Sequence, residues 1–319
     1  MSDEKRPAVR LVEIDGGHEG QRIDNFLLAT LKGVPRSHIY RLLRKGEVRV
    51  NKGRIKPVYR LRAGDVVRIP PVRVGVRAVQ GDVPAGLVAR LEEAIRHEDD
   101  DLMVLDKPAG LAVHGGSGIP YGLIEALCRM RPALPELALV HRLDRETSGC
   151  LLLAKRRSVL LALQAQFQNE EIGKHYLALV KGVWLDGERE VALPLARSRA
   201  QGGRRLMQVQ PDGRPAVTLF TPRAFYAGAT LMAVTLRTGR MHQIRVHAAW
   251  QGHPLAGDEA YGDPAFNRHM RKQGLRRLFL HAWRLVFRHP ASGEQICIEA
   301  PLSGDLAEVL ANLPFSGAL

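Results

Sequence analysis

The sequence predicts an α+β fold with two unequal domains. Three observations support this prediction. First, the chain has 319 residues, of which 45% are hydrophobic, and that length favours two cores over one. Second, positive charge is concentrated in residues 20–70, which contain 13 Lys and Arg but 3 Asp and Glu. Third, the remainder carries more strand-like runs than helical ones, without a regular alternation of the two.

The basic segment, residues 20–70, has the pattern of a small domain of helices and short strands. Apolar residues at helical spacing predict a first helix within Ile23–Leu31 and a second helix that Ser37 caps and Gly46 ends. After Gly46, alternating residues predict a strand, and a turn-forming triplet follows it. Strands are expected at residues 48–50 and 66–69, with the turn at 51–53.

A linker is expected at residues 71–85, where glycine and proline are frequent and large apolar residues are scarce. The larger domain then spans residues 86–319. Its short aliphatic runs, with few helical segments between them, predict a mixed, largely antiparallel sheet. Strands are expected at 102–105, 151–154, 176–180, 231–236, 278–287 and 296–298, and helices at 159–167, 243–251 and 305–313.

The formal charge of +14 predicts a polyanionic partner. Nucleic acid is favoured over an anionic membrane, because no run of about 18 apolar residues could span a bilayer and residues 1–10 do not resemble a signal peptide. A run of charges is more often a solvated face, but here one sign dominates. The side chains expected to contact RNA in the basic segment are Arg36, Arg41, Arg44, Lys45, Arg49 and Lys52.

The cysteines indicate the compartment. Cys128, Cys150 and Cys297 are an odd number at wide spacing, which predicts neither a disulfide framework nor a zinc site. We therefore expect a protein of the reducing cytoplasm that binds no metal.

The densest polar cluster is His141–Gly149, which lies between the apolar runs 137–140 and 150–154. Loops held between buried strands often position catalytic groups. The neighbours of Asp144, Arg142 and Arg145, would favour its ionised form, which suits a nucleophile or a base and not a general acid. An isolated aspartate is more often a turn residue or a salt-bridge partner, so the pattern alone leaves both readings open.

A second cluster, Arg237–His247, contains three arginines that could clamp phosphate or pair with a carboxylate. If the segment from Gln243 is helical, His242 and Arg245 lie on one face and could look into a cleft. As metal ligands, His242, His247 and His253 lack a companion cysteine or paired carboxylate, so no metal site is expected. For Tyr261, in a turn-rich loop, packing and binding are equally plausible roles.

Two resemblances follow from these residues. Arg22-Ile23-Asp24 and residues 46–51 resemble the S4 RNA-binding domain. His141–Gly149, Tyr176, Arg245 and Leu280-His281-Ala282 together resemble the RluA-type pseudouridine synthases, with Met241 where Thr is usual and Glu146 where Asp is common. The resemblance implies Asp144 as the catalytic carboxylate, Tyr176 as the active-site tyrosine and Arg245 as the partner of the carboxylate. It also implies RNA contacts by Arg142, Arg240, His242 and Leu280.

For the whole protein, the resemblance implies a cofactor-free monomer that isomerises several uridines of 23S rRNA, naked or in ribosome-assembly intermediates, after flipping each target base. Three alternatives stay open. One is an inert assembly factor that binds RNA through its S4 domain. Another is a different enzyme, a hydrolase using Ser148 or a metal-dependent nuclease, although Ser148 lacks a GxSxG context. The last keeps the reaction but changes the substrate to tRNA.

Overall fold

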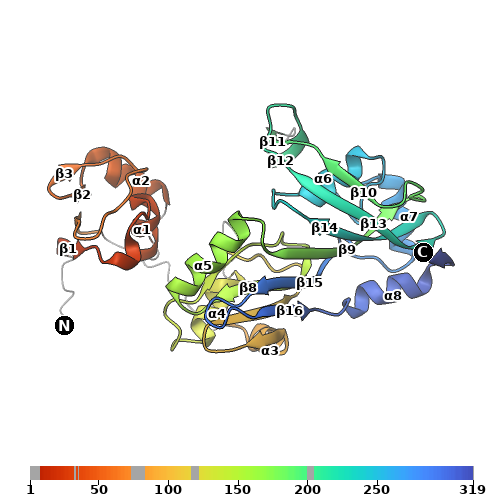
Figure 1. Cartoon of the computed structure of the whole chain (residues 1–319), viewed down its shortest axis with the longest axis horizontal. Coiled ribbons are helices and arrows are strands. Elements are labelled where there is room, and N and C mark those ends of the chain that lie inside the picture. Colours follow the sequence, from red (N-terminus) through yellow and green to blue (C-terminus); the bar gives the residue numbers. More distant parts are fainter. Residues whose placement is uncertain are drawn as a thin grey trace. The chain divides into compact units, whose positions relative to one another are not determined.

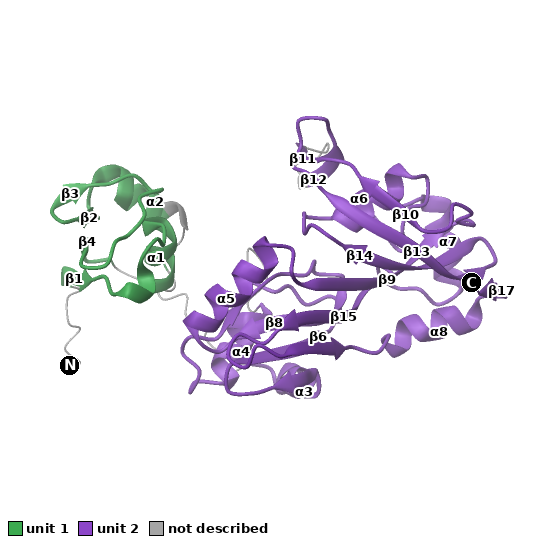
Figure 2. Cartoon of the chain, in the orientation of Figure 1, with its two compact units in different colours: residues 1–82 green, residues 83–319 purple. Residues whose placement is uncertain are grey.

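The structure, a computed structural model, describes residues 8–31, 34, 36–72, 83–115, 122–199 and 205–318 (Figure 1). It divides into two compact units, residues 1–82 and 83–319 (Figure 2). Most of the expected linker, residues 73–82, and the side chain of Arg36 lie outside the described residues. No helix within the described ranges is long and apolar enough to cross a membrane.

Unit 1 is a small α+β domain with a four-stranded antiparallel sheet, in the order β1-β4-β2-β3. Ile23, Leu27, Ile39 and Val67 are fully buried between the sheet and the two α-helices. The elements are β1 (Arg10–Glu13), the 3₁₀-helix η1 (Gly16–His18), α1 (Ile23–Thr30), α2 (Arg36–Lys45), β2 (Arg49–Val50), β3 (Gly53–Arg54) and β4 (Val66–Ile69).

The expected helices, hairpin and strand at 66–69 are confirmed in unit 1. Helix α2 begins at Arg36, one residue before Ser37, and the side chain of Ser37, which was expected to cap it, lies outside the described residues. Gly46 does end α2, with a φ of 68° that favours glycine. Strand β1 was not anticipated; it adds to the sheet by pairing with β4.

Unit 2 is built on a mixed sheet of 11 strands within the described residues. Its main order is β10-β13-β14-β9-β15-β8-β6-β5; all its pairings are antiparallel except that of β8 with β15. The strands are β5 (Ile95–Glu98), β6 (Leu102–Lys107), β7 (Ala138–Leu139), β8 (Ser148–Ala154), β9 (Gly173–Lys181), β10 (Arg189–Ala192), β13 (Val217–Tyr226), β14 (Ala229–Leu236), β15 (Leu280–Arg288), β16 (Gln295–Glu299) and β17 (Phe315–Ala318). A separate hairpin comprises β11 (Leu195–Arg199) and β12 (Arg205–Val209).

Strands β6 and β8 are buried on both sides, because helices cover both faces of this part of the sheet. Along β6 and β8, alternate residues enter two different cores. Met103 and Leu151 pack in the cluster that contains residues of α3 and α4, whereas Val104 and Leu152 pack with α5. The helices are α3 (Ala85–Glu93), α4 (Leu123–Met130), α5 (Arg157–Gln168), α6 (Gln243–Trp250), α7 (Pro264–Lys272) and α8 (Gly304–Asn312).

The expected α+β class and mixed, largely antiparallel sheet are confirmed, and each expected strand and helix of unit 2 has a counterpart within a few residues. The largest differences are at the starts of β8 and β9, which begin at Ser148 and Gly173, three residues before the expected 151 and 176. Helices α3, α4 and α7 were not anticipated.

The parallel pairing of β8 with β15 sets the position of the site. His281 lies opposite Ser148, and Ala282 lies opposite Gly149. Gly149 has a φ of 106°, and a Cβ there would lie 2.2 Å from the carbonyl oxygen of Ala282. Only glycine permits this approach. The loop that precedes β8, with Asp144, is therefore held beside the first residues of β15.

Candidate active site

A pocket of about 180 Å³ opens where the loop before β8 meets β9, the end of β14, the start of α6 and the start of β15. All seven unit 2 residues that the sequence indicated for the site line it, although they come from four separate segments of the chain. They are Arg142, Asp144, Tyr176, Arg240, His242, Arg245 and Leu280.

Two side chains face Asp144, the guanidinium of Arg245 and the imidazole of His242. Its Oδ2 lies 3.6 Å from Nη1 of Arg245 and 3.7 Å from Nε2 of His242, and the carboxylate is 22% exposed. Of the two neighbours expected to supply positive charge, Arg142 lines the pocket with Asp144, whereas Arg145 turns away to the carbonyl of Gly110 and to Glu146. Neither forms an ion pair with Asp144 within the described residues.

Asp258 is the main partner of Arg245, and sequence reasoning missed it. Its carboxylate accepts two hydrogen bonds of 2.7 Å from Nε and Nη2 of Arg245, and further ones from the backbone N–H groups of Ala260 and Tyr261. Burial opposes both charges, yet these contacts lower the pKa of Asp258 and raise that of Arg245. The pair is therefore ionised, and Nη1 of Arg245 is left for Asp144.

His242 lines the pocket, and Tyr261 contacts it from outside the pocket. His242 caps α6 in the left-handed region, with a φ of 56°, and its Nδ1 lies 2.8 Å from the hydroxyl of Tyr261. The Tyr261 ring lies 5.0 Å from the guanidinium of Arg245, and its hydroxyl accepts a hydrogen bond from the N–H of Met207. Burial lowers the pKa of His242 despite the nearby Asp144. Tyr261 thus orients two residues of the site.

The turn that leads into α6 is fixed by Gln243. Its amide oxygen accepts hydrogen bonds from the hydroxyl of Thr238 and the N–H of Arg240, and its NH₂ donates to Val217 and Thr218. This buried network holds the arginine-rich segment in one shape. The sequence indicated the segment but not the role of Gln243.

Lys107 supports the Asp144 loop through a hydrogen bond to the carbonyl of Arg145, and the sequence analysis did not single it out. Its ammonium is fully buried and donates to the carbonyls of Pro108, Leu111 and Arg145 at 3.0, 2.9 and 3.1 Å. Burial lowers its pKa to about 7. These bonds tie the loop after β6 to the loop that carries Asp144.

The residues proposed for hydrolysis or metal binding have other partners. Ser148 is buried and bonded to Nδ1 of His281, whose Nε2 lies 3.1 Å from the carbonyl of Ala300. His247 contacts Thr218 and the carbonyl of Leu193, and His253 contacts the carbonyl of Lys181. Among the residues that the structure describes, no cluster of three potential metal ligands is present.

Basic side chains of unit 1 are exposed, as an RNA-contacting surface requires. Arg41, Arg44 and Lys45 follow at the i, i+3 and i+4 positions of α2 and share a face. Arg49 and Lys52, on β2 and its turn, are also exposed. The side chain of Arg54 lies against Gly46, which brings this hairpin to the end of α2.

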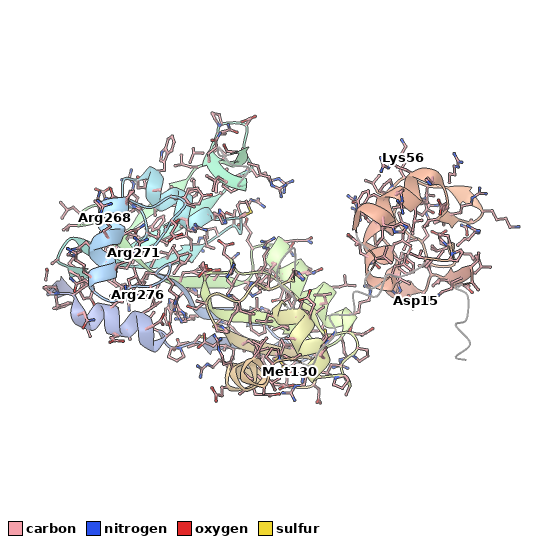
Figure 3. The ribbon with its side chains drawn as sticks, turned by 180° about the vertical axis from the view of Figure 1, so that it is seen from behind. Asp15, Lys56, Met130, Arg268, Arg271 and Arg276 are labelled. Atoms are coloured by element: carbon pink, nitrogen blue, oxygen red, sulfur yellow. The ribbon has the colours of Figure 1, made fainter. Side chains whose placement is uncertain are left out.

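A further basic group lies on unit 2. Arg268 and Arg271 project from α7, and Arg276 projects from the segment that follows it (Figure 3). All three are exposed, and Glu259, 3.5 Å from Arg271, is their one acidic partner within the described residues. The sequence analysis did not single out these arginines because they lie outside the two polar clusters.

Comparison with known proteins agrees with this geometry. Residues 101–250 match the family described as RNA pseudouridylate synthase, and residues 21–67 match the S4 domain. Ribosomal large subunit pseudouridine synthase C of Pasteurella multocida is 50% identical over 314 residues, which cover 98% of this chain and 96% of that protein. Its namesake from Escherichia coli K12 is 51% identical over 310 residues, covering 96% and 97%.

Among solved structures, "Human RNA Pseudouridylate Synthase Domain Containing 4" matches with a TM-score of 0.60 and 24% identity, covering 73% of this chain and 98% of that one. This likeness supports the fold of unit 2. The identity to the curated relatives extends over nearly the whole of both chains and includes the segments that form the pocket. The chain therefore belongs to the RluA-type family of RNA pseudouridine synthases and is an enzyme of that family with an S4 domain.

Proposed function

We propose that this enzyme converts specific uridines of 23S rRNA, the large-subunit ribosomal RNA, to pseudouridine, with Asp144 as its catalytic carboxylate. The observation that carries the proposal is the pocket in which Asp144 faces Arg245 at 3.6 Å. The substrate is supported by relatives named for the large ribosomal subunit, which are 50–51% identical over nearly their full length.

The reaction is an isomerisation, for which we propose a catalytic carboxylate and no cofactor. The N1–C1′ bond of uridine breaks, the uracil turns, C5 bonds to C1′, C5 loses its proton and N1 gains one. No electrons or groups are exchanged with another molecule. Ionised Asp144 acts as a nucleophile or base at the ribose or the uracil. Arg245, held by Asp258, stabilises that ionised form and fixes its position.

Tyr176 forms the wall of the pocket and is 9% exposed. Burial, followed by the charge of Asp144, raises its pKa well above the usual value for a tyrosine, so the phenol stays protonated at neutral pH. A neutral ring suits stacking on the uracil. Its hydroxyl can also take part in removal of the C5 proton.

A uridine within folded RNA must leave its stack to reach the pocket, which costs a few kcal/mol. Phosphate contacts offset that cost. On unit 2, Arg142 and Arg240 line the pocket beside Leu280 and His242. On unit 1 the contacts come from Arg36, Arg41, Arg44, Lys45, Arg49 and Lys52.

For the chain as a whole, we propose an S4 domain at residues 20–70, a linker at 71–85 and a catalytic domain at 86–319. The enzyme works as a monomer in the cytoplasm, on 23S rRNA that is free or in an assembly intermediate.

The test is tritium release from 23S rRNA labelled at uridine C5, since the C5 proton leaves when the new bond forms. Wild type is expected to release tritium, and Asp144→Asn to release it at least about 10³-fold more slowly, with its Kd for the RNA changed by less than about twofold. Asp186→Asn, a change at an exposed aspartate paired with Arg189, is the control and should match wild type.

The outcomes separate the alternatives. Turnover by Asp144→Asn at the wild-type rate would contradict the role of Asp144. Release from tRNA alone would change the substrate, and no release by wild type from either free RNA would contradict free 23S rRNA as the substrate and leave the assembly intermediate.

A further inference from the structure

A second hollow, of about 400 Å³, adjoins the active-site pocket. It lies between the end of α5, the start of β9 and the turn before α6. The two hollows share five wall residues, Arg142, Tyr176, Leu236, Gly239 and Arg240. An RNA strand whose uridine occupies the first can therefore place an adjacent nucleotide in the second.

Lys174 in the wall of this hollow is a buried cation with few partners. It lies on β9, two residues before Tyr176, and is 6% exposed. Within the described chain its ammonium donates one hydrogen bond, of 3.1 Å, to the carbonyl of Arg237, and it lies 5.7 Å from the centre of the Phe167 ring. A lysine ammonium carries three donors, so two are left without a protein acceptor.

Lys107 shows how a lysine with a purely structural role is accommodated in the same unit. Its ammonium is buried as deeply, but its three donors meet three backbone carbonyls. A buried donor without a partner is costly, and a site that leaves donors open beside a hollow is suited to an acceptor from outside the chain.

The charge around the second hollow indicates the kind of acceptor. Arg142, Arg237 and Arg240 line it together with Lys174, against one acidic side chain, Glu170. His141 adds no charge, because burial lowers its pKa to about 4. The net positive wall matches a phosphate group, whose oxygens accept hydrogen bonds from ammonium and guanidinium groups.

We propose that the second hollow binds a backbone phosphate next to the target uridine, with Lys174 as its buried ligand. This inference rests on the proposed RNA substrate. It adds to that proposal the site that binds the RNA backbone beside the reacting nucleotide. Burial lowers the pKa of Lys174, and a bound phosphate would favour its charged form.

The experiment neutralises the two partners separately and together. The modified uridine is first mapped with wild-type enzyme, and an RNA hairpin containing it is synthesised with one methylphosphonate, an uncharged linkage, at each position near the target. Binding and single-turnover pseudouridine formation are measured for wild type and Lys174→Met, which keeps the apolar stem of the side chain. Lys272→Met, on exposed α7 outside the hollow, is the matched control.

With the unmodified hairpin, Lys174→Met is expected to raise the Kd about tenfold, as for loss of a charged hydrogen bond, with the maximal rate nearly unchanged. In wild type, one methylphosphonate beside the target should raise the Kd by a similar factor. In Lys174→Met the same methylphosphonate should add no further loss, because its partner is already gone. Lys272→Met should respond to every linkage as wild type does.

The proposal is overturned if no linkage beside the target is sensitive in wild type, or if its neutralisation weakens Lys174→Met and wild type equally. Lys174 would then be a structural residue. The wild-type scan does not depend on how well the variant folds. Failure of the proposed function looks different, because wild type would then form no pseudouridine in rRNA, so the mapping step itself would find no target uridine.

Discussion

At the scale of single residues, Arg245 is held unequally between two carboxylates. It makes two hydrogen bonds of 2.7 Å to Asp258 but lies 3.6 Å from Asp144. A bidentate pair with Asp144 itself would engage both oxygens of the group that must react. Because Asp258 holds Arg245 in place, the positive charge of Arg245 lies near Asp144 while both oxygens of Asp144 stay available for reaction.

Asp258→Asn tests this arrangement. Removing one partner of a buried pair should lower the free energy of unfolding by about 3 kcal/mol. Misplacement of Arg245 should reduce kcat about 100-fold, with little change in the Kd for RNA. Denaturant unfolding and single-turnover kinetics measure the two effects. Asp305→Asn, which breaks the bidentate pair with Arg277 outside the pocket, should leave kcat unchanged; an equal loss of kcat in both variants would contradict the role of Asp258.

Lys107 predicts a pH dependence of stability. Its pKa is about 7 in the folded protein, against a usual 10.5. Between these values the unfolded chain binds a proton that the folded chain does not, so stability rises with pH. The difference in unfolding free energy between wild type and Lys107→Met should increase by about 1.4 kcal/mol per pH unit across pH 7–10. A difference independent of pH, in denaturant titrations, would show that the amine is charged throughout.

At the scale of elements, the parallel pairing of β8 with β15 determines where the Asp144 loop lies. Gly149→Ala introduces a Cβ against the Ala282 backbone and strains a φ of 106°. We expect a loss of about 3 kcal/mol or more in unfolding free energy. Gly228→Ala is the control, because Gly228 also has a positive φ, of 72°, but open space around it. It should cost about 1 kcal/mol; equal losses would mean that backbone conformation and not the close approach dominates.

The elements that the sequence predicted well are those with a clear period. Strands β6, β8, β9 and β14 are aliphatic, and α5 and α6 carry apolar residues at helical spacing. Helix α7 was missed because its inward face consists of Phe266, Asn267 and Met270 in an otherwise charged segment. Strand β1 was missed because its side chains are mostly exposed, and pairing with β4 stabilises it more than its own pattern does.

At the scale of the whole molecule, the charge of +14 is expected to appear in the salt dependence of RNA binding. Replacing Arg41, Arg44 and Lys45 by Gln should reduce the slope of log Kd against log salt by about 2, since each neutralised phosphate contributes about 0.7. Filter binding over a range of salt concentrations measures the slope. The control replaces Arg10, Arg60 and Arg62, exposed arginines of the same unit. The same change in both triple variants would indicate that net charge matters and the face of α2 does not.

The sequence by itself determined the two-part organisation, the α+β class, the concentration of positive charge in residues 20–70 and the pocket residues contributed by short, dense motifs. Asp144 and Arg245 each lie in a dense polar cluster, but the pattern left their roles open, and the resemblance to the RluA-type synthases implied those roles. The contacts of Asp258, Gln243, Lys107 and Lys174 are visible only in the tertiary structure. Each acts through partners far along the chain or through burial, and neither distance nor desolvation is visible in the order of residues.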